Sequence, residues 1–263
     1  MLSRWLLRYT AIGYLTMLLL IPVGMVFYRT FEHGFWPAFH AVTTPEARQA
    51  LELTLKIVAV VVPLNTVFGI VAALAIARGR FPGRGVFNAL VDLPLALSPV
   101  VVGLSLFLLY GRLGWFGTWL ADHGIHVLFA LPGMILATIF ISLPFVVREV
   151  VPVLREIGTE QEQAAETLGA APFTAFRRIT LPAIRWAVCY GVVLTTARAI
   201  GEFGAVSIVS GRIEGKTETL PLYVQSQFEG FNTTGAFAAS VVLALIAATT
   251  VVAMRFFRPK QEA

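Results

Sequence analysis

Charged residues are scarce in this chain, and cysteine is almost absent. Asp, Glu, Lys and Arg make up only 13% of the 263 residues, whereas hydrophobic residues make up 57% and the mean hydropathy is +0.78. In a soluble domain about a quarter of the residues are charged, so this composition indicates a membrane protein. Cys189 is the single cysteine, which excludes an intramolecular disulfide and a multi-cysteine metal site.

Motifs for nucleotide or metal chemistry are missing as well. Residues 211–217 read GRIEGKT and look like a P-loop, but the two glycines are one residue too close. Neither a strand before this segment nor a helix after it is expected, so any ATP-driven role requires a separate ATPase chain. The sequence predicts no catalytic residue, no cofactor and no metal site. No HExxH pattern surrounds the four histidines, His33, His40, His123 and His126.

Long uncharged runs are present, and they predict six membrane-spanning helices. Crossing the hydrocarbon layer takes about 20 apolar residues per helix. Runs of that order cover residues 9–28, 57–77, 93–111, 127–147, 186–210 and 230–254. Only Arg198 and Glu202 interrupt the fifth run. Strand alternation is lacking, so the expected fold is all-α, a polytopic membrane protein with helices and not barrel strands.

Small residues and prolines inside the runs bear on how the helices pack. Gly69, Ala73 and Ala77 recur at four-residue spacing in the second span, which allows close helix packing in lipid. Chance in an alanine-rich helix explains this spacing equally well. Prolines in the third and fourth spans are expected to break or kink their helices, as transport bundles often need around a pathway. These prolines are Pro94, Pro99, Pro132 and Pro144.

The placement of Lys and Arg predicts that both termini face the cytoplasm. With the N-terminus inside, most of these residues fall on the cytoplasmic side of the predicted spans. The pI near 9.7 therefore reflects topology and not a basic surface for nucleic acid. Arg4 and Arg8 precede the first run as in a signal peptide. Bulky residues 25–28 follow that run in place of a small-residue cleavage site, so the first span is expected to be retained.

A polar loop between the fourth and fifth runs carries the most informative pattern. It reads EQAAETLG over residues 162–169 and ITLP over residues 179–182. Thr159 and Glu162 have the spacing of a capping box, and Gly169 suits a helix end, so a short helix is expected here. Taken alone, such a helix could equally be an ordinary amphipathic segment on the membrane surface.

This loop resembles the coupling loop of ABC-importer permeases of the binding-protein-dependent type I family. The family pattern is an acidic residue, two alanines, three residues, glycine, nine residues and Ile-x-Leu-Pro. This chain departs from it in having Gln163, preceded by Glu162, at the acidic position. The resemblance implies a helix that docks into a cleft on the ATPase subunit. The expected docking residues are Glu162, Gln163, Ala164, Ala165, Leu168, Gly169, Ile179, Leu181 and Pro182.

The same resemblance implies how the chain is organised. Residues 1–50 are expected to form the first transmembrane helix and an outer segment rich in aromatic residues. Residues 51–258 are expected to form the permease core with five spans, and residues 259–263 a cytoplasmic tail. The coupling loop is expected at about residues 155–182, within a cytoplasmic stretch that covers residues 148–182.

Residues 197–211 and 219–224 narrow the resemblance to one branch of the family. Their sequences, ARAIGEFGAVSIVSG and TLPLYV, are similar to the fifth span of sulfate/thiosulfate importer permeases and to the segment after that span. Molybdate permeases share the Glu-Phe-Gly-Ala part. Of the two paralogous sulfate permeases, the W-type is the more similar. The resemblance implies a T-type permease partner, two ATPase subunits and a periplasmic binding protein that selects the oxyanion.

Arg198 and Glu202 are ionisable residues inside a predicted span, and such residues usually face the bundle interior or a wet pathway. Their i, i+4 spacing places them on one helical face, where each partly neutralises the other. An oxyanion would then be attracted without being trapped, as a conduit requires. A purely structural salt bridge is the other interpretation. The candidate pathway residues are Arg198, Glu202, Ser207 and Ser210.

Together these features predict a permease subunit, and not an enzyme, of an ATP-driven sulfate/thiosulfate importer in the bacterial inner membrane. A permease for molybdate or another oxyanion is the nearest alternative. An autonomous secondary transporter is the alternative from a different class, but such proteins usually have repeat symmetry or a filter sequence, which this chain lacks. The residues alone leave open whether the permease pair is homomeric or heteromeric, and the resemblance favours a heteromer.

Overall fold

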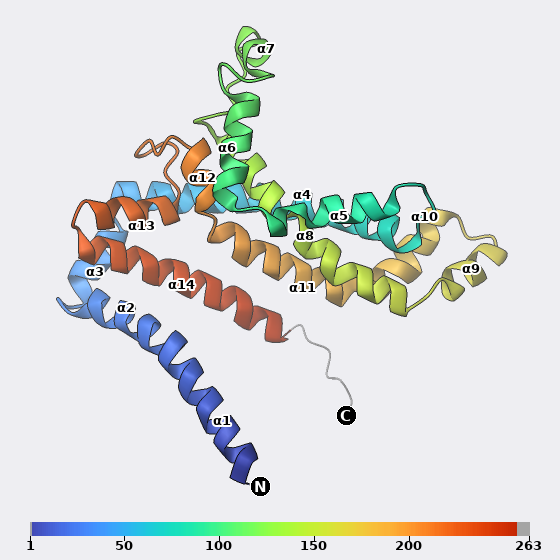
Figure 1. Cartoon of the computed structure of the whole chain (residues 1–263), viewed down its shortest axis with the longest axis horizontal. Coiled ribbons are helices and arrows are strands. Elements are labelled where there is room, and N and C mark those ends of the chain that lie inside the picture. Colours follow the sequence, from blue (N-terminus) through green and yellow to red (C-terminus); the bar gives the residue numbers. More distant parts are fainter. Residues whose placement is uncertain (1, 257–263) are drawn as a thin grey trace.

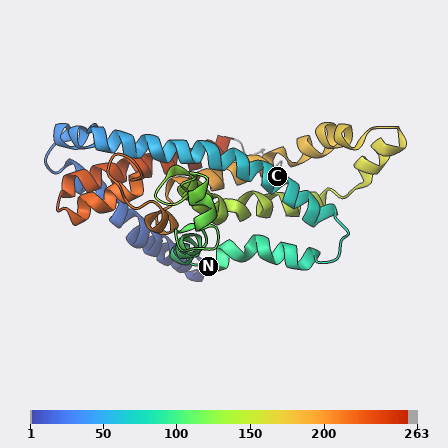
Figure 2. The same cartoon turned by 90° about the horizontal axis from the view of Figure 1, so that it is seen from above.

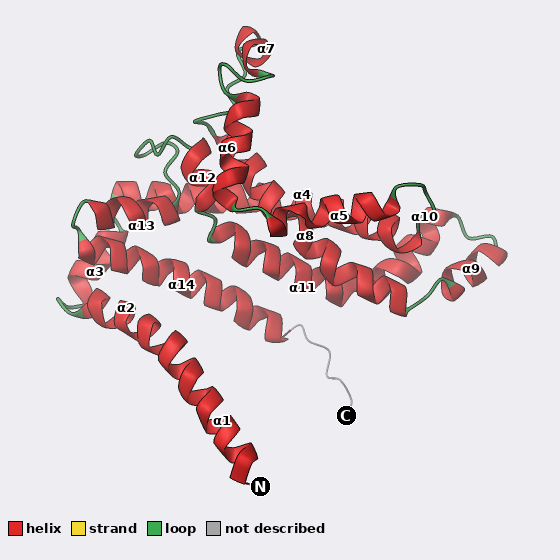
Figure 3. Ribbon diagram, viewed as in Figure 1, coloured by secondary structure: helices red, strands yellow, loops and turns green. Residues whose placement is uncertain are grey.

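A computed structural model describes residues 2–256, and these form helices joined by loops, with no strand among them (Figure 3). Within that range, five helices are long and apolar enough to cross a membrane. They are Trp5–Phe31, Pro45–Arg78, Leu131–Glu156, Pro172–Ile200 and Thr233–Thr250. A bent pair, Arg84–Ala96 and Pro99–Tyr110, makes a sixth if it acts as one span. The predicted all-α membrane fold is confirmed.

Two of these spans consist of several helical segments joined end to end. The first comprises α1 (Leu2–Leu15), a π-helical turn (Thr16–Leu20) and α2 (Ile21–Phe31). The span before the C-terminal one comprises α10 (Pro172–Ala175), a second π-helical turn (Phe176–Thr180) and α11 (Leu181–Ile200). The remaining helices are α3 (Phe35–Val42), α4 (Pro45–Arg78), α5 (Arg84–Ala96), α6 (Pro99–Tyr110), α7 (Gly117–Asp122), α8 (Leu131–Glu156), α9 (Glu160–Thr167), α12 (Gly204–Val209), α13 (Leu220–Glu229) and α14 (Thr233–Phe256).

The central bundle consists of α4, α8 and α11, which lie side by side along the long axis of the molecule (Figures 1 and 2). α9 extends beyond one end of this bundle, whereas α3 and α13 lie at the other end (Figure 1). The first span leads away from the bundle in the direction of the N-terminus (Figure 1). The most apolar stretch of this span is not buried by the rest of the described chain. Its apolar side chains are therefore available to lipid or to another subunit.

Val146 marks a close contact in the bundle, because a glycine of α4 and a glycine of α11 face it. A Cβ atom added at Gly69 of α4 would lie 2.6 Å from the Val146 Cβ, and one added at Gly191 of α11 would lie 2.8 Å from the Val146 Cα. Ala73, one turn after Gly69, is fully buried. Of the two explanations for the small-residue spacing, the positions of Gly69 and Ala73 favour close packing of α4 on α8 over chance.

Replacing Gly69 by leucine should destabilise the bundle, because the added side chain has no room beside Val146. Overpacking of this kind costs roughly 1–3 kcal/mol, or more where the backbone must move. Gly24→Leu is the matched control, because a Cβ at Gly24 meets nothing within 4 Å. Thermal unfolding of the purified chain in detergent should show a lower midpoint for Gly69→Leu only. Equal midpoints for the two variants would contradict this packing.

The third predicted span, residues 93–111, is not one straight helix. α5 and α6 meet at a bend of 110°. Ser98 has an extended backbone there, because a residue that precedes a proline, here Pro99, is disfavoured in the helical conformation. α6 then packs on α12, where a Cβ at Gly103 would lie 2.7 Å from the Ala205 carbonyl oxygen. The run is apolar, as predicted, and the expected break in the third span occurs at Pro99.

The other prolines expected to break or kink helices do not end them. Pro132 lies in the first turn of α8, where its missing N–H would have no helical partner. Pro94 lies within α5 and Pro144 within α8, and both helices continue through these positions. Of the four prolines, only Pro99 marks a break between helices.

The fifth predicted span, residues 186–210, is displaced relative to the helix that forms. The helix covers Pro172–Ile200, and a new one, α12, starts only after a break at residues 201–203. Exposed arginines in its first half, Arg177, Arg178 and Arg185, had excluded that half from the uncharged run. α8 also continues to Glu156. The stretch predicted as loop, residues 148–182, therefore includes parts of two spans.

Candidate functional site

α9 occupies the predicted coupling loop, and its C-terminal end has the geometry that the glycine predicts. Gly169 adopts a left-handed backbone, with φ of +84°. Its N–H donates to the Glu166 carbonyl at 2.9 Å, and the Ala170 N–H donates to the Ala165 carbonyl at 3.0 Å. These two bonds make a Schellman ending, which satisfies carbonyls that the last helical turn leaves free. The predicted helix and its glycine terminus are confirmed.

The capping box predicted for the start of α9 is wrong. In the described chain, the Thr159 hydroxyl accepts no bond from the backbone of α9 and is instead bonded by the Gln163 amide, Nε2 to Oγ1, at 3.2 Å. The Glu162 carboxylate is directed toward other segments, where the Thr180 hydroxyl donates to its Oε1 at 2.7 Å. These tertiary partners take the place of the Thr159 backbone N–H, which the Glu162 side chain would bond in a capping box.

Arg78, the last residue of α4, completes the surroundings of Glu162. Its Nε lies 3.4 Å from Oε2 of Glu162, and its Nη2 donates to the Gly158 carbonyl just before α9. The Arg78 and Glu162 side chains are only 18% and 21% exposed, and Thr180 is buried. We call Arg78, Glu162 and Thr180 the loop anchor. It joins the end of α4, the coupling loop and the segment that leads into α11.

The outer face of the loop mixes polar and acidic groups with small and apolar ones. Gln163, Ala164 and Pro182 are exposed, Leu168 is 88% exposed, and Phe173 is exposed nearby. Three further predicted docking residues are half-buried, namely Ala165, Ile179 and Leu181. Exposed apolar groups beyond the end of a helical bundle are typical of a protein interaction surface. The structure thus brings most of the predicted docking residues to one end of the molecule.

The second candidate site is the ion pair between Arg198 and Glu202. The Arg198 Nη1 lies 2.6 Å from the Glu202 Oε2, and the two side chains are 30% and 2% exposed. α11 ends at Ile200, so the two residues do not share one continuous helix face as predicted. Glu202 Oε1 also accepts the Ala205 N–H at 2.9 Å, which caps the first turn of α12. Glu202 is therefore enclosed between α11 and α12, whereas Arg198 stays accessible.

The two serines predicted for the pathway are engaged with backbone groups. The Ser207 hydroxyl donates to the Gly204 carbonyl at 2.8 Å, and this residue is half-buried. Ser210 is fully buried, and its hydroxyl accepts the Arg212 N–H at 3.1 Å. The structure places both serines on α12 or at its end, on the far side of the break from Arg198. Their part in a pathway stays a prediction.

A small polar cavity adjoins Glu202. Its volume is about 10 Å³, and the polar side chains in its wall are Thr54, Thr138, Glu202 and Thr219. Thr54 also ties two elements together, because its hydroxyl accepts the Leu220 N–H at 2.8 Å. A cavity of roughly 10–15 Å³ holds one water molecule, so this one is too small for an oxyanion.

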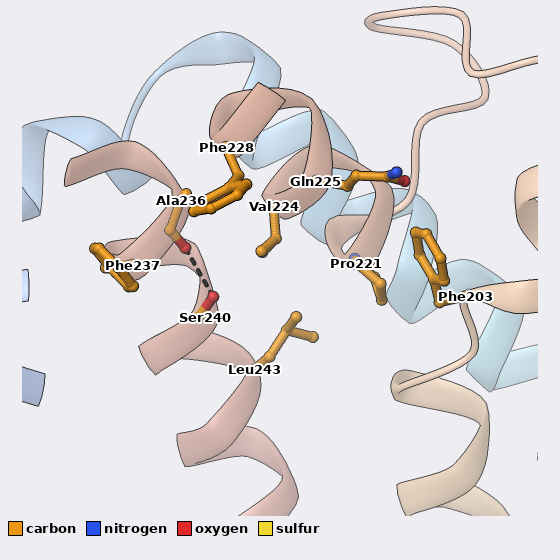
Figure 4. Close-up of a pocket in the computed structure, with 9 residues that line it drawn as sticks. All are labelled: Phe203, Pro221, Val224, Gln225, Phe228, Ala236, Phe237, Ser240 and Leu243. Atoms are coloured by element: carbon orange, nitrogen blue, oxygen red, sulfur yellow. Dashed lines mark hydrogen bonds between the residues drawn. The ribbon is translucent and has the colours of Figure 1, made fainter. Parts of the chain in front are cut away.

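A larger cavity of about 410 Å³ opens beside the break after α11 (Figure 4). Figure 4 shows Phe203 on one side of it and side chains of α13 and α14 on the other. Its polar side chains are Gln225 and Ser240, and the Ser240 hydroxyl already donates to the Ala236 carbonyl at 2.8 Å. Such an apolar wall suits acyl chains or an apolar helix and offers no cation to a dianion.

Comparison with known families identifies the chain. Residues 65–262 match the family described as the binding-protein-dependent transport system inner membrane component. The chain belongs to this family. It is thus a multi-pass inner-membrane component, in agreement with its apolar helices.

Individual relatives are similar over nearly the whole of this inner-membrane component. The sulfate transport system permease protein CysW of Synechocystis sp. is 52% identical over 249 residues, which cover 95% of this chain and 90% of the relative. The sulfate transport system permease protein CysT of Escherichia coli is 39% identical over 236 residues, which cover 89% of this chain and 85% of the relative. A chain of a bacterial alginate ABC transporter, solved in complex with an alginate pentasaccharide-bound periplasmic protein, matches with a TM-score of 0.78. This match covers 96% of our chain and 93% of that chain at 19% identity, so it shows a shared fold alone.

The sequence did not identify every residue that shapes these two sites. Arg78 lies outside the quoted motifs. Ala205 lies inside the segment quoted for residues 197–211, and Thr180 inside the ITLP pattern, but neither had been singled out. Residues 211–217 are a loop in this inner-membrane component, and a helix does follow, but it begins only at Leu220. Within residues 2–256, no group of three or more His, Cys, Asp or Glu side chains could hold a metal ion.

Proposed function

We propose that this chain is the W-type permease subunit of an ATP-driven, binding-protein-dependent importer for sulfate or thiosulfate. The observation that carries the proposal is the 52% identity to a sulfate permease of that type over 95% of the chain. The lower identity to a T-type permease, 39%, supports the W-type assignment and a heteromeric pair. The further partners of the complex are ABC ATPase subunits and a periplasmic sulfate-binding protein.

The coupling loop is the part of the chain that receives the ATPase. α9 lies beyond the end of the bundle, with Ala164 and Leu168 exposed on it, as a helix that enters a cleft on another protein requires. Closure of the ATPases would push on α9 and shift the attached spans between inward- and outward-open states. ATP hydrolysis takes place in the partner chains, and the loop couples two distant sites through a two-state element.

Arg198 is the residue that we assign to the translocation path. An anion that leaves water for a low-dielectric pathway is stabilised by a nearby positive charge, whereas a full-strength binding site would trap it. The unequal exposure of the pair, 30% for Arg198 and 2% for Glu202, supports an arginine that can face an ion while its partner moderates the charge. Selection of the oxyanion is left to the binding protein.

Uptake of labelled anions tests the proposed function. Cells that lack their own sulfate permeases should take up labelled sulfate, and not labelled molybdate, when they express this chain with its T-type, ATPase and binding-protein partners. Uptake of molybdate alone would favour the molybdate alternative. Transport by this chain without any ATPase would favour an autonomous secondary transporter and would overturn the proposal.

Labelling of single cysteines tests the proposed orientation, with both termini in the cytoplasm. In a Cys189→Ser background, a cysteine at Glu160 should be shielded from an impermeant thiol reagent in intact cells, and one at Glu214 should be labelled. Both positions are exposed, and α9 lies at the opposite end of the molecule from the loop that joins α12 and α13. Permeabilised cells, in which both should react, are the control. The reverse pattern would refute the orientation and the coupling role with it.

A further inference from the structure

The helix that would contact the ATPase has little of its own to hold it in place. None of the residues 160–167 of α9 is buried. Glycines with left-handed backbones flank it on both sides, Gly158 with φ of +63° and Gly169 with φ of +84°. Burial of an apolar face is what fixes most helices in proteins, and α9 lacks such a face. Without a further contact, movement of this helix would therefore change the loop around it and would not be transmitted to the spans.

The loop anchor supplies the missing connection. Glu162 is the acidic residue of α9 that is bonded to the rest of the protein, through the Thr180 hydroxyl at 2.7 Å and the Arg78 guanidinium at 3.4 Å. Arg78 also holds the Gly158 carbonyl, on the chain that enters α9. Because these side chains are largely withdrawn from solvent, their ion pair is screened less than a surface pair.

We infer that Arg78, Glu162 and Thr180 are positioning residues that transmit movement of the docked α9 to α4 and α11. The inference rests on the proposed function and deepens it. Glu162 faces its own chain, so it is not available as a carboxylate for the ATPase, and the exposed Ala164 and Leu168 make that contact. Arg78 carries the movement into α4, and Thr180, which directly precedes α11, carries it into that span.

Glu162→Gln removes the charge that holds Arg78 but leaves the exposed face of α9 intact. In the purified complex, ATPase subunits should copurify in wild-type amounts, while ATP hydrolysis should no longer rise on addition of the loaded binding protein. Uptake should fall by about tenfold or more, since the loss of a charged hydrogen bond is worth at least a factor of this order. The control is Glu166→Gln, an exposed carboxylate one turn later on the same helix, which should behave as wild type.

Exchanging the two charges separates a positioning role from direct contact with the ATPase. The double variant Arg78→Glu, Glu162→Arg re-forms the pair with opposite polarity and should recover part of the uptake that each single variant loses. Loss of ATPase copurification in Glu162→Gln, with no recovery in the exchanged double variant, would mean that Glu162 touches the ATPase, and would overturn the inference.

Hydrogen exchange tests the anchor independently of any substrate. Backbone amides of residues 160–167 in the purified complex should exchange about tenfold faster in Glu162→Gln than in wild type or Glu166→Gln, because the helix loses its attachment. Equal exchange in all three proteins would overturn the inference even if sulfate uptake were normal. Faster exchange in Glu162→Gln, if the wild-type complex does not transport sulfate, would uphold the anchor and refute the proposed function.

Discussion

Gly169→Val should leave the chain inserted in the membrane but unable to dock its ATPase. Gly169 has φ of +84°, a region that a β-branched residue adopts only under strain. A left-handed conformation costs a residue with a Cβ about 1–2 kcal/mol, which corresponds to about a tenfold loss of affinity if docking must restore it. Valine would therefore unwind the Schellman ending and displace Leu168, the most exposed apolar group of the loop. Copurification with the ATPase is the measurement.

Gly169→Asn and Gly169→Ala show which property of the glycine matters. A Cβ at this position meets nothing within 4 Å in the described chain, so any crowding must come from the ATPase itself. Asparagine tolerates the left-handed conformation better than alanine but is larger. If conformation decides, asparagine should keep docking better than alanine. If close approach decides, alanine should be the better tolerated. Normal assembly and normal ATP hydrolysis in Gly169→Val would refute the coupling assignment.

The fold could be predicted from composition and hydropathy as far as the type of the spans, and their number agrees if α5 and α6 act as one span. Composition and hydropathy count apolar residues but do not show where the backbone of an apolar run changes direction. The run at residues 93–111 was apolar throughout, yet the backbone turns at Ser98 because Pro99 follows it. The limits of the fifth span were predicted wrongly because its helix begins in a charged stretch. Its first half carries arginines that lie exposed on a helix, and hydropathy excluded them.

In the candidate sites, the features that depend on neighbouring residues could be predicted, and those that depend on tertiary contacts could not. The glycine ending of α9 depends on neighbouring residues alone, and the sequence predicted it correctly. The role of Glu162 depends on Arg78, which is distant in the chain, and on Thr180, which follows the loop. A capping box was the best local assignment for this carboxylate, but partners from other segments replaced it. No pattern in a single sequence pairs residues across such distances.

The Arg198–Glu202 pair is where a transport role and a structural role make opposite predictions. Glu202 caps α12 through the Ala205 N–H and is almost fully enclosed, so its position does not depend on Arg198 alone. Arg198 forms an ion pair with Glu202 and is partly exposed. Neutralising Glu202 as glutamine would retain an oxygen for the Ala205 N–H. Variants at the two positions can therefore separate the loss of a positive charge from the exposure of an unpaired buried carboxylate.

Arg198→Met should abolish sulfate uptake while the complex still assembles and docks its ATPase. Methionine keeps an unbranched apolar side chain on α11 but removes the charge that offsets desolvation of the anion. Uptake should fall by at least about tenfold, the effect of losing about 1.4 kcal/mol of stabilisation along the path. Arg198→Lys, which keeps the charge but not the planar guanidinium, is the matched control and should retain part of the uptake. Assembly and ATPase content are measured on the same preparations.

The double variant Arg198→Met, Glu202→Gln decides between the two roles. If Arg198 lines the path, the double variant should assemble normally and still fail to transport, because neutralising both residues leaves nothing to attract the anion. A structural salt bridge predicts poor assembly in Arg198→Met, since an unpaired buried charge is destabilising by about 3–5 kcal/mol. The double variant would then recover both assembly and uptake, because the uncompensated charge is gone. That recovery would remove Arg198 from the translocation path and leave it as a tie between α11 and the carboxylate that caps α12.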